Sequence, residues 1–194
     1  MPELSSRRTQ LLDAAMGVLA AEGLRGLTHR AVDRRAGVPE GSTSAYWRTR
    51  QALQVALTEY VAERLLSDVD AMAARMRARG GTQEQRIEQA LELFLRWLGQ
   101  RDLFVARLEL TMAASRDDDL AALLLDHRAR LGQVVEEIVR AAGKEHGAGR
   151  AEALVATYDG LLLAALLRPP SERRPFLAES LRLLSSSLLA PDEG

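Results

Sequence analysis

The chain contains no cysteine, and this absence excludes several kinds of site. With no cysteine among 194 residues, the protein has no disulfide framework, no thiolate zinc site and no cysteine nucleophile. Its three histidines, His29, His127 and His146, are isolated and lack the H-x-x-x-H spacing of a metal site. We therefore expect no metal, no cofactor and no catalytic residues.

Long hydrophobic runs are also missing. The longest unbroken apolar run, residues 161–167, is far too short to cross a bilayer. The first residues, MPELSSRRTQLLDAA, have no long apolar core and no signal-cleavage pattern. No stretch shows the signals of a β-strand. These absences predict an all-α, cytoplasmic protein with no membrane partner.

Charge is divided unevenly along the chain. The net charge is −1, yet residues 1–50 hold eight arginines and five acids and so carry +3. The rest of the chain therefore carries −4. A basic segment on an otherwise acidic chain is the electrostatic pattern expected of a small DNA-binding domain.

Residues 27–47, LTHRAVDRRAGVPEGSTSAYW, read as two short helices joined by a tight turn. Thr28 suits the N-cap of the first helix, because its hydroxyl can accept from free backbone N–H groups. Gly37 suits the left-handed residue that ends this helix, and Pro39 begins a second helix at about residues 40–46. One side of the first helix is apolar, at Ala31, Val32 and Ala36. Its polar residues face elsewhere: Arg30, Asp33 and Arg34.

The second helix is rich in small polar residues and can bury little apolar surface against its own protein. Such a helix suits close approach to the major groove of DNA, as in helix-turn-helix proteins. The same pattern, taken alone, also fits an ordinary connection in an all-α interaction module.

A longer helix at residues 6–22 supplies the apolar face that two short helices need. Its stripe consists of Leu11, Ala15, Val18 and Leu19, and Gly23 ends it. Residues 1–48 are therefore expected to form a three-helix DNA-binding domain.

The run from residue 7 to residue 57 resembles the N-terminal domain of the TetR family of bacterial transcriptional regulators. The resemblance rests on the glycine after the first helix, the threonine opening the second, the AGV turn, Tyr46-Trp47, and Arg50 before Ala52-Leu53. Two positions depart from the family pattern. Ser44 stands where a tyrosine or another large residue is usual, and Glu40 is acidic where basic or neutral polar residues are usual.

The resemblance implies a homodimer that binds a palindromic operator in double-stranded DNA. It further implies repression until a small organic effector enters a C-terminal ligand-binding and dimerisation domain, here residues 49–194. Two alternatives stay open at this point: an all-α interaction module, and a transcriptional activator without a small-molecule ligand.

Candidate DNA contacts fall into two groups. Arginines at the helix-turn-helix suit phosphates, whereas Ser42 and Ser44 suit base edges and Thr43 offers a methyl group to thymine. Trp47 is expected in the core. The complete candidate set is Thr28, His29, Arg30, Glu40, Gly41, Ser42, Thr43, Ser44, Tyr46, Arg48 and Arg50.

Apolar periodicity predicts six further helices, with no strand between them. Residues 83–99 are apolar almost all round, which favours a central buried helix. The last two helices hold more apolar surface than one subunit can cover, with Leu181, Leu184 and Leu188 on the second, which predicts dimerisation. The expected ranges are 49–79, 83–99, 101–115, 117–142, 149–168 and 171–189, with a GKEHGAG loop at residues 143–149.

Two charged residues, Arg107 and Glu109, interrupt an otherwise apolar helix. They lie about 200° apart on a helix, so at most one should point inward, and both could instead lie on solvated flanks. Aromatic and flexible side chains nearby suit the walls of a site for a small organic molecule. The predicted pocket is lined by Phe94, Trp97, Phe104, Arg107, Glu109, Met112 and Tyr158, with Arg107 or Glu109 as its polar anchor.

Overall fold

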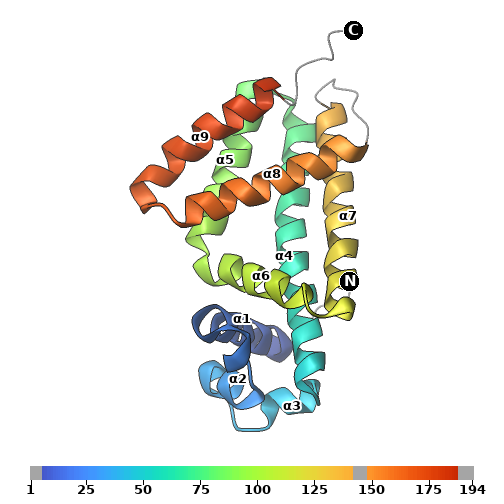
Figure 1. The fold of residues 1–194 in the computed structure, drawn as a ribbon, viewed down its shortest axis with the longest axis vertical. Coiled ribbons are helices and arrows are strands. Elements are labelled where there is room, and N and C mark those ends of the chain that lie inside the picture. Colours follow the sequence, from blue (N-terminus) through green and yellow to red (C-terminus); the bar gives the residue numbers. More distant parts are fainter. Residues whose placement is uncertain (1–5, 142–147, 188–194) are drawn as a thin grey trace. The chain divides into compact units, whose positions relative to one another are not determined.

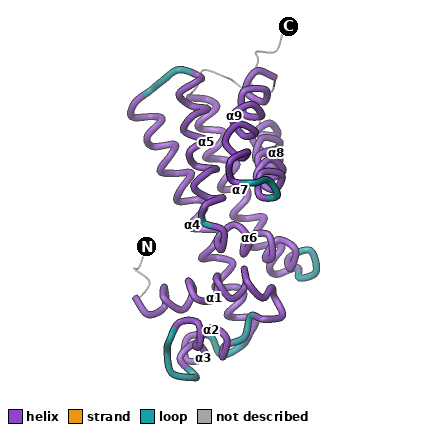
Figure 2. The backbone as a smooth tube through the Cα atoms, turned by 90° about the vertical axis from the view of Figure 1, so that its left-hand side faces the viewer, coloured by secondary structure: helices purple, strands orange, loops and turns teal. Residues whose placement is uncertain are grey.

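The computed structural model describes residues 6–141 and 148–187, which are helices and loops without a strand (Figure 2). The all-α prediction is confirmed. In chain order the helices are α1 (Ser6–Gly26), α2 (His29–Ala36), α3 (Ser42–Tyr46), α4 (Arg50–Arg79), α5 (Gln83–Gly99), α6 (Arg101–Ala114), α7 (Asp118–Ala141), α8 (Ala148–Leu166) and α9 (Pro170–Ser187).

The chain divides into two compact units, and each is discontinuous in sequence. The first comprises residues 1–65 and 100–127, and the second comprises residues 66–99 and 128–194. Both α4 and α7 contribute residues to each unit. These two units are defined by which residues pack together. The expected boundary between residues 48 and 49 instead separates DNA binding from ligand binding and dimerisation, and it stays a prediction.

In the first unit, α1 packs on α2 and α6, and α2 packs on α3 (Figure 1). The predicted stripe of α1 is buried, with Leu11, Ala15 and Leu19 fully inaccessible. Gly17 lets α1 approach its neighbour closely, because a Cβ there would lie 2.3 Å from Arg35 Nε. Packing of the apolar stripe therefore joins the short helices into one unit.

The local helix signals mostly hold in the structure. Thr28 Oγ1 accepts from Ala31 N–H at 3.2 Å, and Gly37 adopts the left-handed conformation (φ 66°, ψ 36°). Gly23, with φ 66° and ψ −175°, interrupts α1 near its predicted end. The predicted start of the second short helix is wrong: α3 begins at Ser42, because Gly41 takes φ 92° and ends the turn that Pro39 opens.

In the second unit, α5 packs against α8 and α9, and α8 packs against α9 (Figure 1). Its core includes Leu91, Leu93, Leu154 and Leu162. The prediction that α5 is apolar almost all round needs correction, since Glu84, Glu88 and Glu92 form an exposed acidic side. The predicted loop at 143–149 and His146 lie outside the described residues, apart from 148 and 149, which begin α8.

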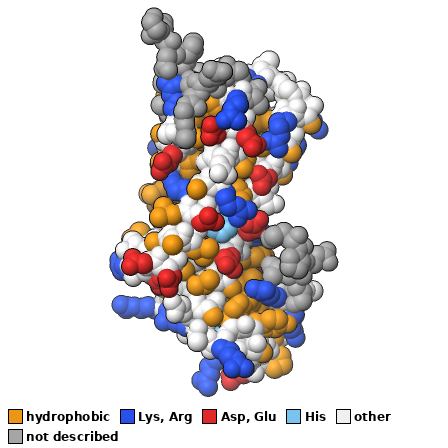
Figure 3. Space-filling model, turned by 90° about the vertical axis from the view of Figure 1, so that its right-hand side faces the viewer, with side chains coloured by type: hydrophobic (Ala, Val, Ile, Leu, Met, Phe, Trp, Pro, Cys, Tyr) orange, Lys and Arg blue, Asp and Glu red, His pale blue; other side chains and the backbone are white. Residues whose placement is uncertain are grey.

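Within residues 6–141 and 148–187, no helix is sufficiently long and apolar to span a membrane. The same residues hold no group of three or more His, Asp or Glu side chains placed to bind a metal ion. On the face drawn in Figure 3, acidic and basic side chains are interspersed among hydrophobic ones.

Two glycines with room for a Cβ provide a matched test of the turn after α2. We expect Gly37→Ala to lower the free energy of unfolding by about 1 kcal/mol, because alanine is strained at positive φ. Gly132→Ala, within α7, should instead raise it by roughly 0.5–1 kcal/mol, since alanine favours helix. Urea denaturation followed by circular dichroism measures both, and equal effects from the two changes would contradict the assignment of the turn.

Candidate functional site

A buried carboxylate, Asp33 of α2, holds the start of α3. Only 1% of Asp33 is exposed, and its Oδ2 accepts from Gly41 N–H at 2.8 Å. Its Oδ1 accepts from Thr43 N–H at 2.8 Å and from the Thr43 hydroxyl at 2.5 Å. Three donors from one short segment therefore satisfy the carboxylate and fix α3 relative to α2.

A second link joins the two ends of this segment. His29 Nε2 donates to the Trp47 carbonyl oxygen at 2.7 Å, so the start of α2 contacts the residue after α3. Trp47 is buried, as predicted, and the guanidinium of Arg8 lies 5.6 Å from its ring centroid. His29 thus has a positioning contact within the protein.

The remaining polar side chains of α3 stay near the surface. Ser42 Oγ donates to Pro39 O at 2.7 Å, and Ser44 Oγ donates to Gly41 O at 2.9 Å. Each hydroxyl oxygen retains acceptor capacity. Tyr46 is exposed, as is Ala45 before it. The result is a short helix with a small, polar outer side.

The candidate arginines have different surroundings. Arg30 and Glu40 form an ion pair at 3.9 Å with both side chains largely exposed. Arg50 donates to the Leu24 carbonyl oxygen, while Arg48 is exposed and makes no ion pair with another described residue. Among these three arginines, Arg48 is the one whose guanidinium has no hydrogen bond or ion pair with the described residues.

The expected role of Thr43 needs correction. Its side chain is completely buried and its hydroxyl is bound by Asp33, so its methyl group cannot reach a base. Asp33 itself was expected to face away from the apolar side of α2. A lone acid between arginines gives no sequence signal of burial, because its three donors lie eight to ten residues further along the chain.

An apolar cavity of about 140 Å³ lies within the second unit. Its walls come from α4, α5, α7, α8 and α9 and include Met72, Phe94, Val135 and Tyr158. Phe94 stacks with Trp97 at 6.0 Å between ring centroids and meets Tyr158 edge-on at 5.4 Å. Aromatic and aliphatic walls with a few polar groups are typical of a small-molecule site.

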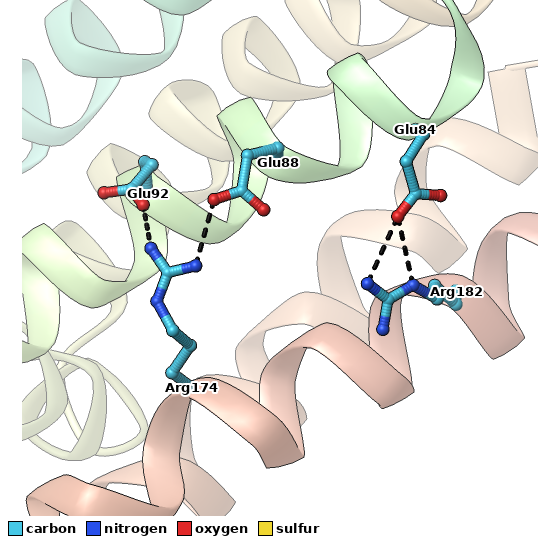
Figure 4. Close-up of polar contacts among 5 residues, drawn as sticks. All are labelled: Glu84, Glu88, Glu92, Arg174 and Arg182. Carbon is cyan, nitrogen blue, oxygen red and sulfur yellow. Dashed lines mark hydrogen bonds and ion pairs between the residues drawn. The ribbon is translucent and has the colours of Figure 1, made fainter.

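Ion pairs hold together the two helices that form one wall of the cavity. Arg174 of α9 pairs with Glu88 at 3.0 Å and with Glu92, and Arg182 pairs with Glu84 at 3.1 Å (Figure 4). We call these five residues the α5–α9 seam. They are exposed, so each pair contributes little alone, although the linked pairs align the helices.

The structure brings together only part of the predicted pocket. Phe94, Trp97 and Tyr158 line the cavity, whereas the other predicted residues belong to the first unit and are not in its lining. Phe104 is fully buried there with Arg107 over its ring, Glu109 lies near Gly23, and Met112 is 57% exposed. The proposed anchor at Arg107 or Glu109 therefore needs correction: charged residues in α6 are accommodated by packing and partial exposure in the first unit.

Several cavity residues were missed by reasoning from the sequence. They come from α4 and α7, and their periodicity showed only that each helix has an apolar side. Nothing local distinguishes a residue that fills the core from one that borders a cavity. The additional members include Val69, Met76, Leu131, Val135, Ile138 and Val139.

The first unit thus has the geometry of a helix-turn-helix, and the comparisons identify its family. Residues 11–57 match the family described as bacterial regulatory proteins, tetR family. Residues 81–190 match the tetracyclin repressor-like C-terminal domain. The chain belongs to the TetR family of DNA-binding transcriptional regulators, which are not enzymes.

A known relative is the HTH-type transcriptional regulator CymR of Pseudomonas putida, 32% identical over 111 residues. The match covers 57% of this chain and 52% of CymR, so it spans about half the length of that relative.

Solved structures share the fold over nearly the whole chain. A transcriptional regulator from Rhodococcus sp. Rha1 has a TM-score of 0.75 at 22% identity, covering 94% of this chain and 97% of that one. The multidrug binding protein EbrR, complexed with imidazole, has a TM-score of 0.67 at 26% identity, covering 97% of both chains.

The Asp33 contacts lead to a stability prediction. Asp33→Ala leaves the donors of Gly41 and Thr43 without their acceptor, so we expect the free energy of unfolding to fall by about 3 kcal/mol. Arg34→Ala, which removes an exposed neighbouring side chain, should change it by less than about 0.5 kcal/mol. Urea denaturation measures both variants, and similar values for the two would show that Asp33 does not hold α3.

Proposed function

We propose that this protein is a repressor that acts as a homodimer on a palindromic operator and leaves it when a small organic effector binds. Residues 1–48 bind double-stranded DNA in this proposal, and residues 49–194 bind the effector and form the dimer. The protein acts in the cytoplasm, on the bacterial chromosome. The observation that carries the effector part is the apolar cavity in the second unit.

The DNA contacts divide into those that position the protein and those that read sequence. Arg30, Arg48 and Arg50 contact phosphates, which contribute affinity without sequence information. Ser42 and Ser44 contact base edges from the outer side of α3. The remaining candidate DNA contacts surround these residues in the proposed interface: Thr28, His29, Glu40, Gly41 and Tyr46.

Small-molecule binding by a related structure supports the effector part. EbrR has been solved with imidazole, proflavin, ethidium and malachite green. Our chain holds a cavity lined by apolar and aromatic residues in its C-terminal part. We infer that occupation of this cavity favours a state with lower affinity for the operator, since a ligand shifts an equilibrium only through differential affinity.

Exposed leucines on the last two helices support the dimer. Leu163 of α8 is 46% exposed, Leu183 of α9 is 61% exposed, and Leu167, just beyond α8, is 81% exposed. A two-fold partner presents the same patch in return and can cover these side chains. Of the leucines expected in the α9 stripe, Leu181 is buried, Leu184 is half-buried and Leu188 lies outside the described residues.

Two substitutions separate phosphate contacts from base contacts. Arg48→Ala should weaken binding to every duplex and reduce the slope of log K against log salt by about one unit. Ser44→Ala should leave that slope unchanged and alter the preference for the duplex flanking the protein's own gene over competitor DNA. Gel retardation at several salt concentrations measures both.

Arg75→Ala is the matched control, because Arg75 is an exposed arginine of α4 in the second unit. It should retain the wild-type affinity and slope. If Arg48→Ala behaves like this control, the phosphate contact is not made by Arg48. If the wild-type protein does not select any fragment flanking its gene, the proposed repressor function is wrong.

The dimer proposal is tested with charges on the exposed leucines. We expect the double variant Leu163→Glu, Leu183→Glu to be monomeric at micromolar concentration in light scattering, because burying charge at an apolar interface is costly. Leu125→Glu places the same charge on another exposed leucine, in α7, and should remain dimeric. A dimeric double variant would place the interface elsewhere.

A further inference from the structure

The polar side chains that line the cavity are mostly committed to other partners. Trp97 Nε1 donates to Asp68 at 2.7 Å, Asp159 pairs with Arg128 at 2.7 Å, and Gln83 Nε2 donates to Ser185 Oγ at 3.0 Å. Arg86 Nη1 donates to the Gly81 carbonyl oxygen at 2.6 Å. These contacts engage the polar groups of the lining, and Arg128 pairs the charge of its carboxylate.

Tyr158 differs from these groups. Its hydroxyl makes no hydrogen bond with another described residue, although the residue lines the cavity beside Phe94. Burial raises the pKa of Tyr158 above its ordinary value of 10.0, so the phenol is neutral and keeps its proton at neutral pH. It therefore offers one neutral O–H donor, with acceptor capacity, at an otherwise apolar wall.

The size of the cavity limits the occupant. Drug-sized ligands occupy pockets of roughly 300–1,000 Å³, whereas a closed apolar cavity of about 150 Å³ is large enough for benzene. The cavity described here measures about 140 Å³. It thus matches a single aromatic ring and is small for the three fused rings of proflavin.

We propose that the effector is an uncharged compound with one aromatic ring and one hydrogen-bonding substituent, which bonds to the Tyr158 hydroxyl. The assignment rests on the proposed function and names the ligand class of the same cavity. The ring packs among Phe94, Met72 and the aliphatic residues of α7, while the substituent replaces the water that would otherwise solvate the phenol.

The charged residues of the lining explain why the ligand is uncharged. Asp159 is the carboxylate of the lining, and Arg128 already neutralises it, so a cation would have to compete with a 2.7 Å ion pair. Arg86 is the cationic lining residue, but it lies in the first turn of α5 and is half-exposed, so its charge is solvated. A cation would lose hydration without gaining a free carboxylate, and an anion would gain only a guanidinium that water already solvates.

Calorimetry on the full-length wild-type protein tests the class directly, without DNA. p-Cresol is the probe, p-xylene is its counterpart without the hydroxyl, and benzoate and proflavin represent anions and cations. We expect p-cresol to bind most tightly of the four. Tyr158→Phe should lower the affinity for p-cresol about tenfold and leave the affinity for p-xylene unchanged, because it removes only the hydrogen bond.

A second pair of variants locates the binding. Ala90→Leu adds bulk to a residue of the cavity lining and should lower the affinity for both p-cresol and p-xylene. Ala74→Leu, on the exposed side of α4, should leave both affinities unchanged. Circular dichroism confirms that each variant is folded. Tighter binding of benzoate or proflavin, no binding of p-cresol, or equal p-cresol affinity in Tyr158→Phe would overturn the proposed class.

Gel retardation separates this inference from the proposed function. If the protein selects its flanking DNA and proflavin releases it while p-cresol does not bind, the ligand class is wrong and the regulator stands. If p-cresol binds with dependence on Tyr158 but no flanking fragment is selected, the ligand class stands and the repressor proposal is wrong.

Discussion

The position of α3 depends on the hydrogen bonds that the Asp33 carboxylate accepts. A helix as short as α3, Ser42–Tyr46, is unstable alone, because the first turn costs more conformational entropy than one hydrogen bond returns. Asp33 offsets this cost by accepting from Gly41 and from both donors of Thr43. The contact of His29 with Trp47 closes the other end, so the outer side of α3 is presented in one orientation.

The apolar cavity in the second unit lowers the packing density of its core. Protein interiors are close-packed, and an empty space lined by apolar groups loses dispersion contacts. The second unit nevertheless retains one beside Phe94 and Tyr158, while the α5–α9 seam keeps its outer wall aligned. A ligand that filled this cavity would stabilise the folded unit, because it would bind the folded chain and not the unfolded one.

Reasoning from the sequence failed at the charged residues. Asp33 was expected to face away from the core, and Arg107 or Glu109 was expected to anchor the ligand. In the structure Asp33 is buried because backbone N–H groups of a later segment reach it, and the α6 residues pack in the first unit. The free energy of a charged side chain depends on partners supplied by other helices, and helical periodicity contains no information on them.

The sequence by itself determined the elements and the family. Apolar spacing marked the helices to within a few residues, Thr28 and Gly37 marked the two ends of α2, and the motif around α2 and α3 identified the TetR resemblance. These signals are local, because caps and periodicity act within a few residues. Tertiary structure alone decided that Asp33 holds α3, that Tyr158 borders a cavity and that α6 contributes no residue to the lining of that cavity. Each depends on side chains from separate helices meeting in space, which no local pattern encodes.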